Sequence, residues 1–294
     1  MKQTLYLIIG FLFLACRQPK QLTVSAAPSI PSIKGDWKEV SINPYDKFDE
    51  LHYRWMSFDD SIGIGNLFLS HRQSYYIHHD TLFINRDPKN EFSGSFRFPI
   101  LKLTKDSLVL FSPYGAFAFK SSRMELARIT QQNTIQPAAI YFASGRNYGL
   151  SPRMFLEIDA DRNFKFFGKF ATALKGGFHG TISEADYAVI LTLINTLPVD
   201  SLQEFYPGNA DFQIRGMAIE WNGKLIKSTA RGSEKLVLPE LTILFDKLMD
   251  LYNHTSLQPD STVTESYFSQ HPAAKPTTLL LDENEMFRIL TSGK

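Results

Sequence analysis

The sequence contains a single cysteine, Cys16, among its 294 residues. With no second thiol in the chain, no internal disulfide can form, and the fold depends on its own core. Cysteine-based metal sites and cysteine nucleophiles are excluded for the rest of the chain. An excess of charge is missing as well, because the formal net charge is +1. A charge this close to zero gives no electrostatic basis for binding nucleic acid.

The N-terminal apolar run, residues 5–15, is too short to cross a bilayer, which takes about 20 residues. It follows Lys2 and ends in Phe13-Leu14-Ala15-Cys16. A positive start, a short apolar segment and a small residue at the cut site are typical of a secretory signal. Because a cysteine follows the small residue, the segment resembles a bacterial lipoprotein signal, with residues 1–15 as the signal peptide.

This resemblance implies cleavage before Cys16 and a diacylglyceryl thioether on its sulfur, usually with an N-acyl chain. Stable anchoring takes at least two acyl chains, since each buried methylene contributes about 0.8 kcal/mol. Arg17 rather than Asp follows, so the usual inner-membrane retention signal is missing, and no acidic run marks the chain for the cell surface. We expect the periplasmic face of a bacterial outer membrane. The alternative is a plain secretory signal with Cys16 as a bystander.

The composition is that of a folded protein, with 44% hydrophobic and 13% aromatic residues. The Pro-, Ser-, Ala- and Gln-rich residues 16–34 predict a flexible tether. Two folded units are expected after it, over residues 35–124 and 140–254, with a joint at 130–137. Residues 255–294 are expected to form a C-terminal tail, whose apolar part, residues 278–290, is compatible with a strand or short helix that docks back.

The first unit reads as about eight short strands with turn residues between them and no helical period. The expected strands are residues 37–42, 52–56, 66–69, 75–77, 81–84, 97–103, 108–111 and 116–119. A meander that closes on itself hides its strand edges, so a small antiparallel β-barrel is predicted.

Within this unit, Gly35-Asp36-Trp37 resembles the Gly-x-Trp motif of lipocalins. Residues 82–84 and 101–108 resemble the small lipocalin-like domains of bacterial lipoproteins. Because the unit is shorter than a lipocalin, two interpretations stay open. In one, Trp37 closes the floor of the barrel and side chains fill the barrel interior. In the other, the barrel holds a small apolar ligand.

Three histidines of the first unit, His71, His78 and His79, raise the question of a metal site. On a strand, the adjacent His78 and His79 would point to opposite faces and could not share an ion. No acidic cluster with ligand spacing accompanies them. Exposed turn histidines are the favoured interpretation, and no metal or cofactor is expected.

The second unit mixes strand and helix periods. Alternation predicts strands at 153–159, 164–170 and 178–182. A helix capped by Ser183 follows and ends at Pro198. Residues 217–221 and 224–229 flank the hairpin signal Asn222-Gly223, and a second helix starts at Pro239. The order predicts an α+β sandwich, an antiparallel sheet with two helices on one face.

This unit resembles a bacterial domain of unknown function, family 6438, over about residues 140–254. The resemblance rests on residues 181–187, on the hairpin Trp221-Asn222-Gly223-Lys224 and on the helix at 239–251. Members of that family often carry Cys-aromatic-Gly-x-Cys-Pro before the first strand. Residues 147–152 read Asn-Tyr-Gly-Leu-Ser-Pro in that place, so a redox or metal role for such a cysteine pair is excluded in this chain.

A catalytic set is hard to assemble from this sequence. Nucleophile, base and orienting residue could be sought among Ser144, Ser151, His179 and Asp211. No Gly-x-Ser-x-Gly elbow is present to expose a serine, and His179 reads more simply as a residue on a strand edge.

Surface features of the second unit give no clearer site. An anion-binding patch of Arg146, Arg153 and Arg215 is less favoured than solvated surface arginines. The loop at 206–209 is a candidate binding tip, because loops often carry function. Cys16, as the lipid attachment site, is the one site residue predicted.

The expected function is that of a non-enzymatic interaction or structural module, held at the membrane by its N-terminal lipid. Its partners would be envelope proteins or glycans, and not nucleic acid. A carrier of a small apolar ligand, using the first unit, is the alternative. A hydrolase using His179 is third.

Overall fold

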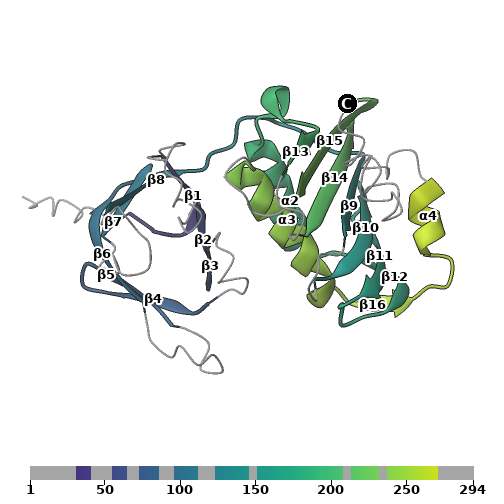
Figure 1. Ribbon diagram of the computed structural model, residues 1–294, viewed down its shortest axis with the longest axis horizontal. Helices are drawn as coiled ribbons and strands as arrows, with labels where there is room; N and C mark the ends of the chain where they lie inside the picture. The colour runs from purple at the N-terminus through teal and green to yellow at the C-terminus, as the bar shows by residue number, and fades with distance from the viewer. Residues whose placement is uncertain are drawn as a thin grey trace, which may run out of the picture. The chain divides into compact units, whose positions relative to one another are not determined.

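The computed structural model describes residues 31–40, 55–64, 73–85, 96–111, 123–145, 151–207, 213–231 and 237–270. Two eight-stranded sheets account for most of the fold (Figure 1). No helix in these ranges has the length and apolar character needed to span a membrane. Cys16, the signal peptide and most of the expected tether lie outside the described residues.

The first sheet is an antiparallel meander in the strand order β3-β2-β1-β8-β7-β6-β5-β4. Ile62 in β3 and Gln73, just before β4, exchange two backbone hydrogen bonds of 2.7 and 2.8 Å, which nearly close the barrel. The predicted lipocalin-like antiparallel barrel is therefore confirmed at the level of the fold. Its strands are β1 (Gly35–Glu39), β2 (Trp55–Phe58), β3 (Ile62–Ile64), β4 (Tyr75–His78), β5 (Thr81–Ile84), β6 (Phe96–Leu103), β7 (Ser107–Phe111) and β8 (Arg123–Arg128).

Apolar side chains pack together inside the barrel. Trp37 is fully buried, its indole N–H donates to the carbonyl of Ile33 at 2.8 Å, and the Arg128 guanidinium lies 4.2 Å from its ring centroid. Within the described part of the barrel, these side chains form one buried apolar cluster. The core cluster consists of Ile33, Trp37, Met56, Phe58, Ile62, Leu82, Ile84, Phe98, Leu108, Leu110, Met124 and Leu126.

Two barrel strands differ from the sequence prediction. β3 and β8 were not predicted, while the expected strands at 66–69 and 116–119 lie outside the described residues. β8 ends at Arg128, past the expected unit boundary at residue 124. All three residue pairs that join β8 to β1 use residues after 124, so the barrel needs the chain at least to Arg128.

The second sheet has the order β13-β15-β14-β9-β10-β11-β12-β16 and is antiparallel except for the short β13–β15 pair. Two helices, α2 (Glu184–Thr196) and α3 (Pro239–Asp250), cover one face, and α4 (Glu265–Gln270) lies on the other (Figure 1). The remaining elements are β9 (Ala139–Ser144), β10 (Arg153–Asp159), β11 (Asn163–Phe170), β12 (Gly176–Thr181), η2 (Val199–Ser201), β13 (Phe205–Tyr206), β14 (Ile214–Trp221), β15 (Lys224–Arg231), η3 (Leu251–Asn253) and β16 (Leu257–Pro259).

The helix cap and the hairpin turn predicted for the second unit are both confirmed. The Ser183 hydroxyl accepts the backbone N–H of Asp186 at 3.0 Å and caps α2. Asn222 and Gly223 both have positive φ, +50° and +70°, and turn the chain between paired Trp221 and Lys224. Positive φ at both turn residues is what a two-residue hairpin with the twist of its strands requires. The predicted α+β sandwich is confirmed.

Two parts of this unit were predicted wrongly. β9 is a central strand between β14 and β10, yet no strand was expected there. Residues 255–270, expected as part of a polar tail, contain β16, which pairs with β12, and α4. The sheet is therefore larger than the predicted five strands and is covered on both faces.

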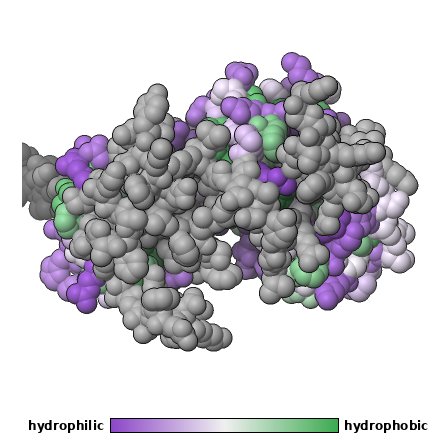
Figure 2. All heavy atoms as spheres, viewed as in Figure 1, coloured by the Kyte–Doolittle hydropathy of each residue, from purple (hydrophilic) through white to green (hydrophobic). Residues whose placement is uncertain are grey.

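The face under α2 and α3 is the inner face, and the face under α4 is the outer face. Alternation along β10 sends Met154, Leu156 and Ile158 inward and Phe155 and Glu157 outward. In the view of Figure 2, hydrophilic side chains dominate the described surface and hydrophobic ones form small separate areas.

Candidate functional site

The outer face of the second sheet holds a segment of the chain's own C-terminal part. After β16 the chain turns back over β10, β11 and β12 as residues 260–270, here named the strap, which includes α4. Thr264 starts α4, because its hydroxyl accepts the backbone N–H of Tyr267 at 3.1 Å. Glu265, Tyr267 and Phe268 of the strap make the main side-chain contacts with the sheet, and Asp260 and Val263 add to them.

Glu265 is held by two cations. Its carboxylate accepts hydrogen bonds from Lys169 Nζ at 2.9 and 2.6 Å and from Arg153 Nη2 at 3.3 Å. Arg153 starts β10 and Lys169 lies near the end of β11, and both point to the outer face. Charge-assisted bonds of this kind are stronger than neutral ones and orient the carboxylate. We name Arg153 and Lys169 the carboxylate clamp.

Tyr267 completes a polar network with Glu157 and Lys165. Its hydroxyl donates to Glu157 Oε2 at 2.8 Å and accepts from Lys165 Nζ at 2.5 Å. Lys165 also bonds Glu157 Oε1 at 3.3 Å and lies 4.5 Å from the Tyr267 ring centroid. Glu157 is only 9% exposed, so these partners offset the cost of burying its charge.

The protonation states of this network follow from its surroundings. Burial alone would lower the pKa of Lys165, but the Tyr267 hydroxyl and the Glu157 charge outweigh it and raise that pKa. Burial, with help from Glu157, raises the pKa of Tyr267. Burial and then the Glu157 charge raise the pKa of neighbouring Tyr141. At neutral pH Lys165 is therefore an ammonium, and Tyr267 and Tyr141 are neutral phenols.

Phe268 fills an apolar slot next to this network. Its ring stacks on Phe155 with the centroids 5.6 Å apart, and it is 1% exposed. Ala143 and Ile214 form the rest of the slot floor, and Val263 of the strap closes it.

The backbone of β12 is shaped for the strap's approach. A Cβ on Gly177 would overlap the carbonyl oxygens of Val263 and Asp260, so only glycine lets the strap come this close. Asp260 N–H donates to Gly177 O at 2.8 Å, and Asp260 Oδ2 lies 3.2 Å from His179 Nδ1. The outer face is thus fitted to a polypeptide segment by charge, by ring packing and by backbone contact.

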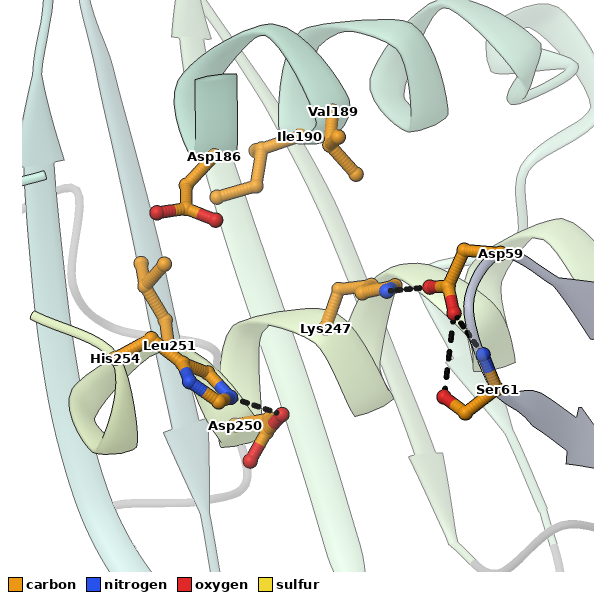
Figure 3. Close-up of a pocket in the computed structure, with 9 residues that line it drawn as sticks. All are labelled: Asp59, Ser61, Asp186, Val189, Ile190, Lys247, Asp250, Leu251 and His254. Atoms are coloured by element: carbon orange, nitrogen blue, oxygen red, sulfur yellow. Dashed lines mark hydrogen bonds and ion pairs between the residues drawn. The ribbon is translucent and has the colours of Figure 1, made fainter. Parts of the chain in front are cut away.

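A second feature is a cavity of about 380 Å³ on the exposed side of α2 and α3 (Figure 3). His254 Nε2 lies 2.9 Å from Asp250 Oδ2, Lys247 Nζ lies 3.4 Å from Asp59 Oδ2, and the Ser183 hydroxyl donates to Asp186 at 2.6 Å. The charged side chains that line the cavity therefore pair with other side chains of this protein, and the lining does not indicate a particular class of ligand. The lining residues are Asp59, Ser61, Asp186, Val189, Ile190, Lys247, Asp250, Leu251 and His254.

One carboxylate of this cavity has a shifted pKa. Burial would raise the pKa of Asp250, but hydrogen bonds from Asn253 and His254 outweigh it and hold the pKa below its ordinary value. Asp250 is therefore charged at neutral pH and orients the His254 ring.

The serine and histidine considered for catalysis are not brought together. Ser144 is buried on the inner side of β9, and its hydroxyl donates to the Pro152 carbonyl at 2.7 Å. His179 lies on β12, three strands away, and points to the outer face toward Asp260. Ser151 lies in the segment before β10, and Asp211 is outside the described residues.

The arginines considered as one anion patch are also separated. Arg153 contacts Glu265 on the outer face, whereas Arg215 bonds Asp246 of α3 at 2.6 Å on the inner face. Arg146, and Gly208 and Asn209 of the candidate binding loop, lie outside the described residues.

The histidines of the barrel lie at a turn. His78 ends β4, His79 follows with φ +50°, and their Nδ1 atoms are 3.1 Å apart on exposed side chains. His71 lies outside the described residues. Within the described ranges, no three His, Cys, Asp or Glu side chains are grouped so as to hold a metal ion.

Sequence reasoning missed the strap and its partners. The strap was assigned to a polar tail, and Lys165 and Lys169 were not singled out within the strand predicted at 164–170. Two signals were available: Thr264 three residues before Tyr267, as a helix cap, and the Gly176-Gly177 pair in a strand, which is typical of close backbone approach.

Residues 138–252 match the family model described as Domain of unknown function (DUF6438). The match runs from just before β9 into η3, and it confirms the resemblance stated for the second unit. The strap at 260–270 lies outside the matched residues. No curated protein matches the chain.

Proposed function

We propose that this chain is an envelope lipoprotein that works by binding another macromolecule and not by catalysis. The outer face of the second sheet carries this proposal. There the carboxylate clamp, the Glu157–Lys165 pair and the Phe155 slot bind a polypeptide segment through three different side chains. Sites for small ligands are usually concave and mostly apolar, whereas this one is an extended face with charged and aromatic contacts.

The apolar packing inside the barrel supports an interaction module over a carrier. Among the described barrel residues, twelve buried hydrophobic ones form one cluster, and Trp37 is fully enclosed. A carrier would need that volume for its ligand. The barrel then contributes its outer surface, or serves as a spacer between the membrane and the second domain.

Anchoring through Cys16 is the second part of the proposal. It rests on Ala15-Cys16 at the end of the apolar run and on Arg17, which favours the periplasmic face of the outer membrane. A protein fixed there meets partners in two dimensions, which suits a binding module of modest affinity.

The anchor is tested with Cys16→Ser. Without the sulfur no diacylglyceryl thioether can form, so we expect the variant to leave the membrane pellet for the soluble fraction. Arg17→Asp is the matched control and should stay membrane-bound but move to the inner membrane. Unchanged sedimentation of Cys16→Ser would contradict the anchor.

Binding is tested by photo-crosslinking in native envelopes. A photoreactive residue at Gln258, exposed on β16 and paired with the outer-face residue His179, leaves the clamp intact and should give a discrete covalent adduct that mass spectrometry identifies. The same residue at Lys102, exposed on β6 of the barrel, is the control position. No adduct from either position would contradict an interaction module. Native mass spectrometry showing a stoichiometric apolar molecule bound to the purified protein would favour the carrier instead.

A further inference from the structure

The strap lies against side chains that all belong to the matched domain. The matched residues 138–252 contain β9 to β15 and both inner-face helices, and thus also the clamp, the Glu157–Lys165 pair and the Phe155 slot. The strap follows only after β16. The binding surface and its occupant therefore belong to separate parts of the chain.

The outer face contacts strap side chains of three different kinds, in a fixed order along the sequence. A carboxylate at Glu265 meets the clamp, a phenol two residues later meets Glu157 and Lys165, and the next residue places a ring on Phe155. The clamp residues are partly exposed, with side chains 28% and 39% accessible, whereas Phe268 is buried. A buried aromatic anchor with charged contacts around it is the usual anatomy of a protein–protein recognition site.

The occupant is weakly ordered by itself. α4 has six residues, far fewer than an isolated helix needs, so its conformation depends on the sheet. The strap contributes two side chains, Val263 and Phe268, to a buried apolar cluster, and segments with so few apolar contacts open locally at a free energy below that of global unfolding. Because the strap follows β16 directly, its effective concentration at the face is high, on the order of millimolar. A partner segment must compete with that concentration.

We propose that the outer face is a recognition site for a partner polypeptide segment with a carboxylate followed two residues later by a Tyr-Phe pair. Residues 260–270 are then its tethered occupant, which the partner displaces. This inference rests on the proposed function, since it names the surface and the partner chemistry of the interaction module.

The experiment uses the full mature chain, made soluble by Cys16→Ser, in two forms. One keeps the strap, and the other carries Tyr267→Ala and Phe268→Ala to release it. The probe is a fluorescein-labelled peptide with the sequence of residues 260–270, followed by fluorescence anisotropy. We expect the released form to bind the peptide at least about tenfold more tightly than the form with its strap, because the strap occupies the site.

Two controls define the site. A peptide carrying Glu265→Lys should lose binding, because it presents a cation to the clamp. Arg153→Ala with Lys169→Ala, added to the released form, should weaken binding by about tenfold or more while the circular dichroism spectrum stays unchanged. A folded released form that does not bind the peptide overturns the inference.

If the released form does not fold, hydrogen exchange of the unaltered strap decides. We expect the amides of α4 to exchange about a hundredfold faster than those of β10 and β11, through local opening. Equal protection of α4 and these strands would make the strap part of the cooperative core and overturn the inference. Failure of the proposed function appears separately, as envelopes in which the Gln258 position gives no adduct.

Discussion

The inner face of the second sheet lies under two helices of twelve or more residues, whereas the outer face lies under the six-residue α4. The inner contact is mainly apolar: Phe142, Phe245 and Leu244 belong to one large buried cluster, and the two rings lie 5.6 Å apart. The outer contact combines one buried ring with a carboxylate clamp and a phenol network. Both faces keep water off the same strands, but by different chemistry.

This difference suggests that the inner face contributes mainly to stability and the outer face mainly to specificity. Apolar burial is proportional to area and has no preferred direction, so the inner face accepts any well-shaped apolar cover. Charged and hydrogen-bonded contacts need defined partners and geometry, so we expect the outer face to discriminate between covering segments by their sequence. The contrast predicts that the fold depends mainly on the inner face and recognition on the outer face.

The largest expected effect comes from deleting a ring on each face. Phe166 is fully buried on the inner face and stacks on Tyr252 with centroids 4.6 Å apart. Phe166→Ala should lower the free energy of unfolding by about 3–5 kcal/mol through lost burial and a cavity. Phe155→Ala, on the outer face, should cost about 2 kcal/mol, because the strap can settle into the space. Urea unfolding of both variants measures this, and a larger loss for Phe155→Ala would reverse the comparison.

A smaller effect is expected from removing one hydroxyl. Tyr267→Phe keeps the ring but leaves Glu157 without its phenol donor, which should cost about 1–2 kcal/mol. Hydrogen exchange should show the loss at α4 and not at α3. Tyr252→Phe is the matched control on the inner face, where the ring supplies the contact, and should change stability less. Equal changes in protection over both helices would show that the faces are coupled.

The smallest effect is expected in how stability depends on pH. The inner-face helix layer should respond at acidic pH and the outer face at alkaline pH. Asp250, in the inner-face helix layer, has a lowered pKa, so its contribution is present above about pH 4 and is lost as the pH falls through its folded value. Lys165 and Tyr267 have raised pKa values, so theirs is present below about pH 10 and is lost as the pH rises through the folded values. Thermal melts across pH should show both limbs.

Single variants show which groups cause the loss of stability at acidic pH (the acid limb) and at alkaline pH (the alkaline limb). His254→Ala should flatten the acid limb, since the His254 hydrogen bond helps to lower the pKa of Asp250. Tyr267→Phe should flatten the alkaline limb. An alkaline limb that Tyr267→Phe leaves unchanged would remove the outer network as its cause.

Elements with clear local signals could be predicted from the sequence. Ser183, Asn222-Gly223 and Pro239 act through their own backbone geometry, so α2, the β14–β15 hairpin and α3 were found. β9 was missed because all six of its residues are buried, so it shows no alternation that periodicity can detect.

The outer-face site could not be predicted for a similar reason. Arg153, Lys165 and Lys169 look like solvent-facing residues of ordinary strands until the strap is placed over them. Glu265 and Tyr267 lie about a hundred residues further along the chain, in a stretch whose polar composition indicates a tail. Only the tertiary fold shows that these two sets of residues meet.

The pairing of β1 with β8 has a consequence for how the barrel is completed as the chain is synthesised. Among the described barrel strands β1 is the first to be made, and one of its two neighbours, β8, is the last. Until Arg128 has been added, the edge of β1 opposite β2 is open to any other strand nearby, the situation in which mispairing begins. Chains that stop before residue 128 should therefore aggregate more readily than chains that extend past it.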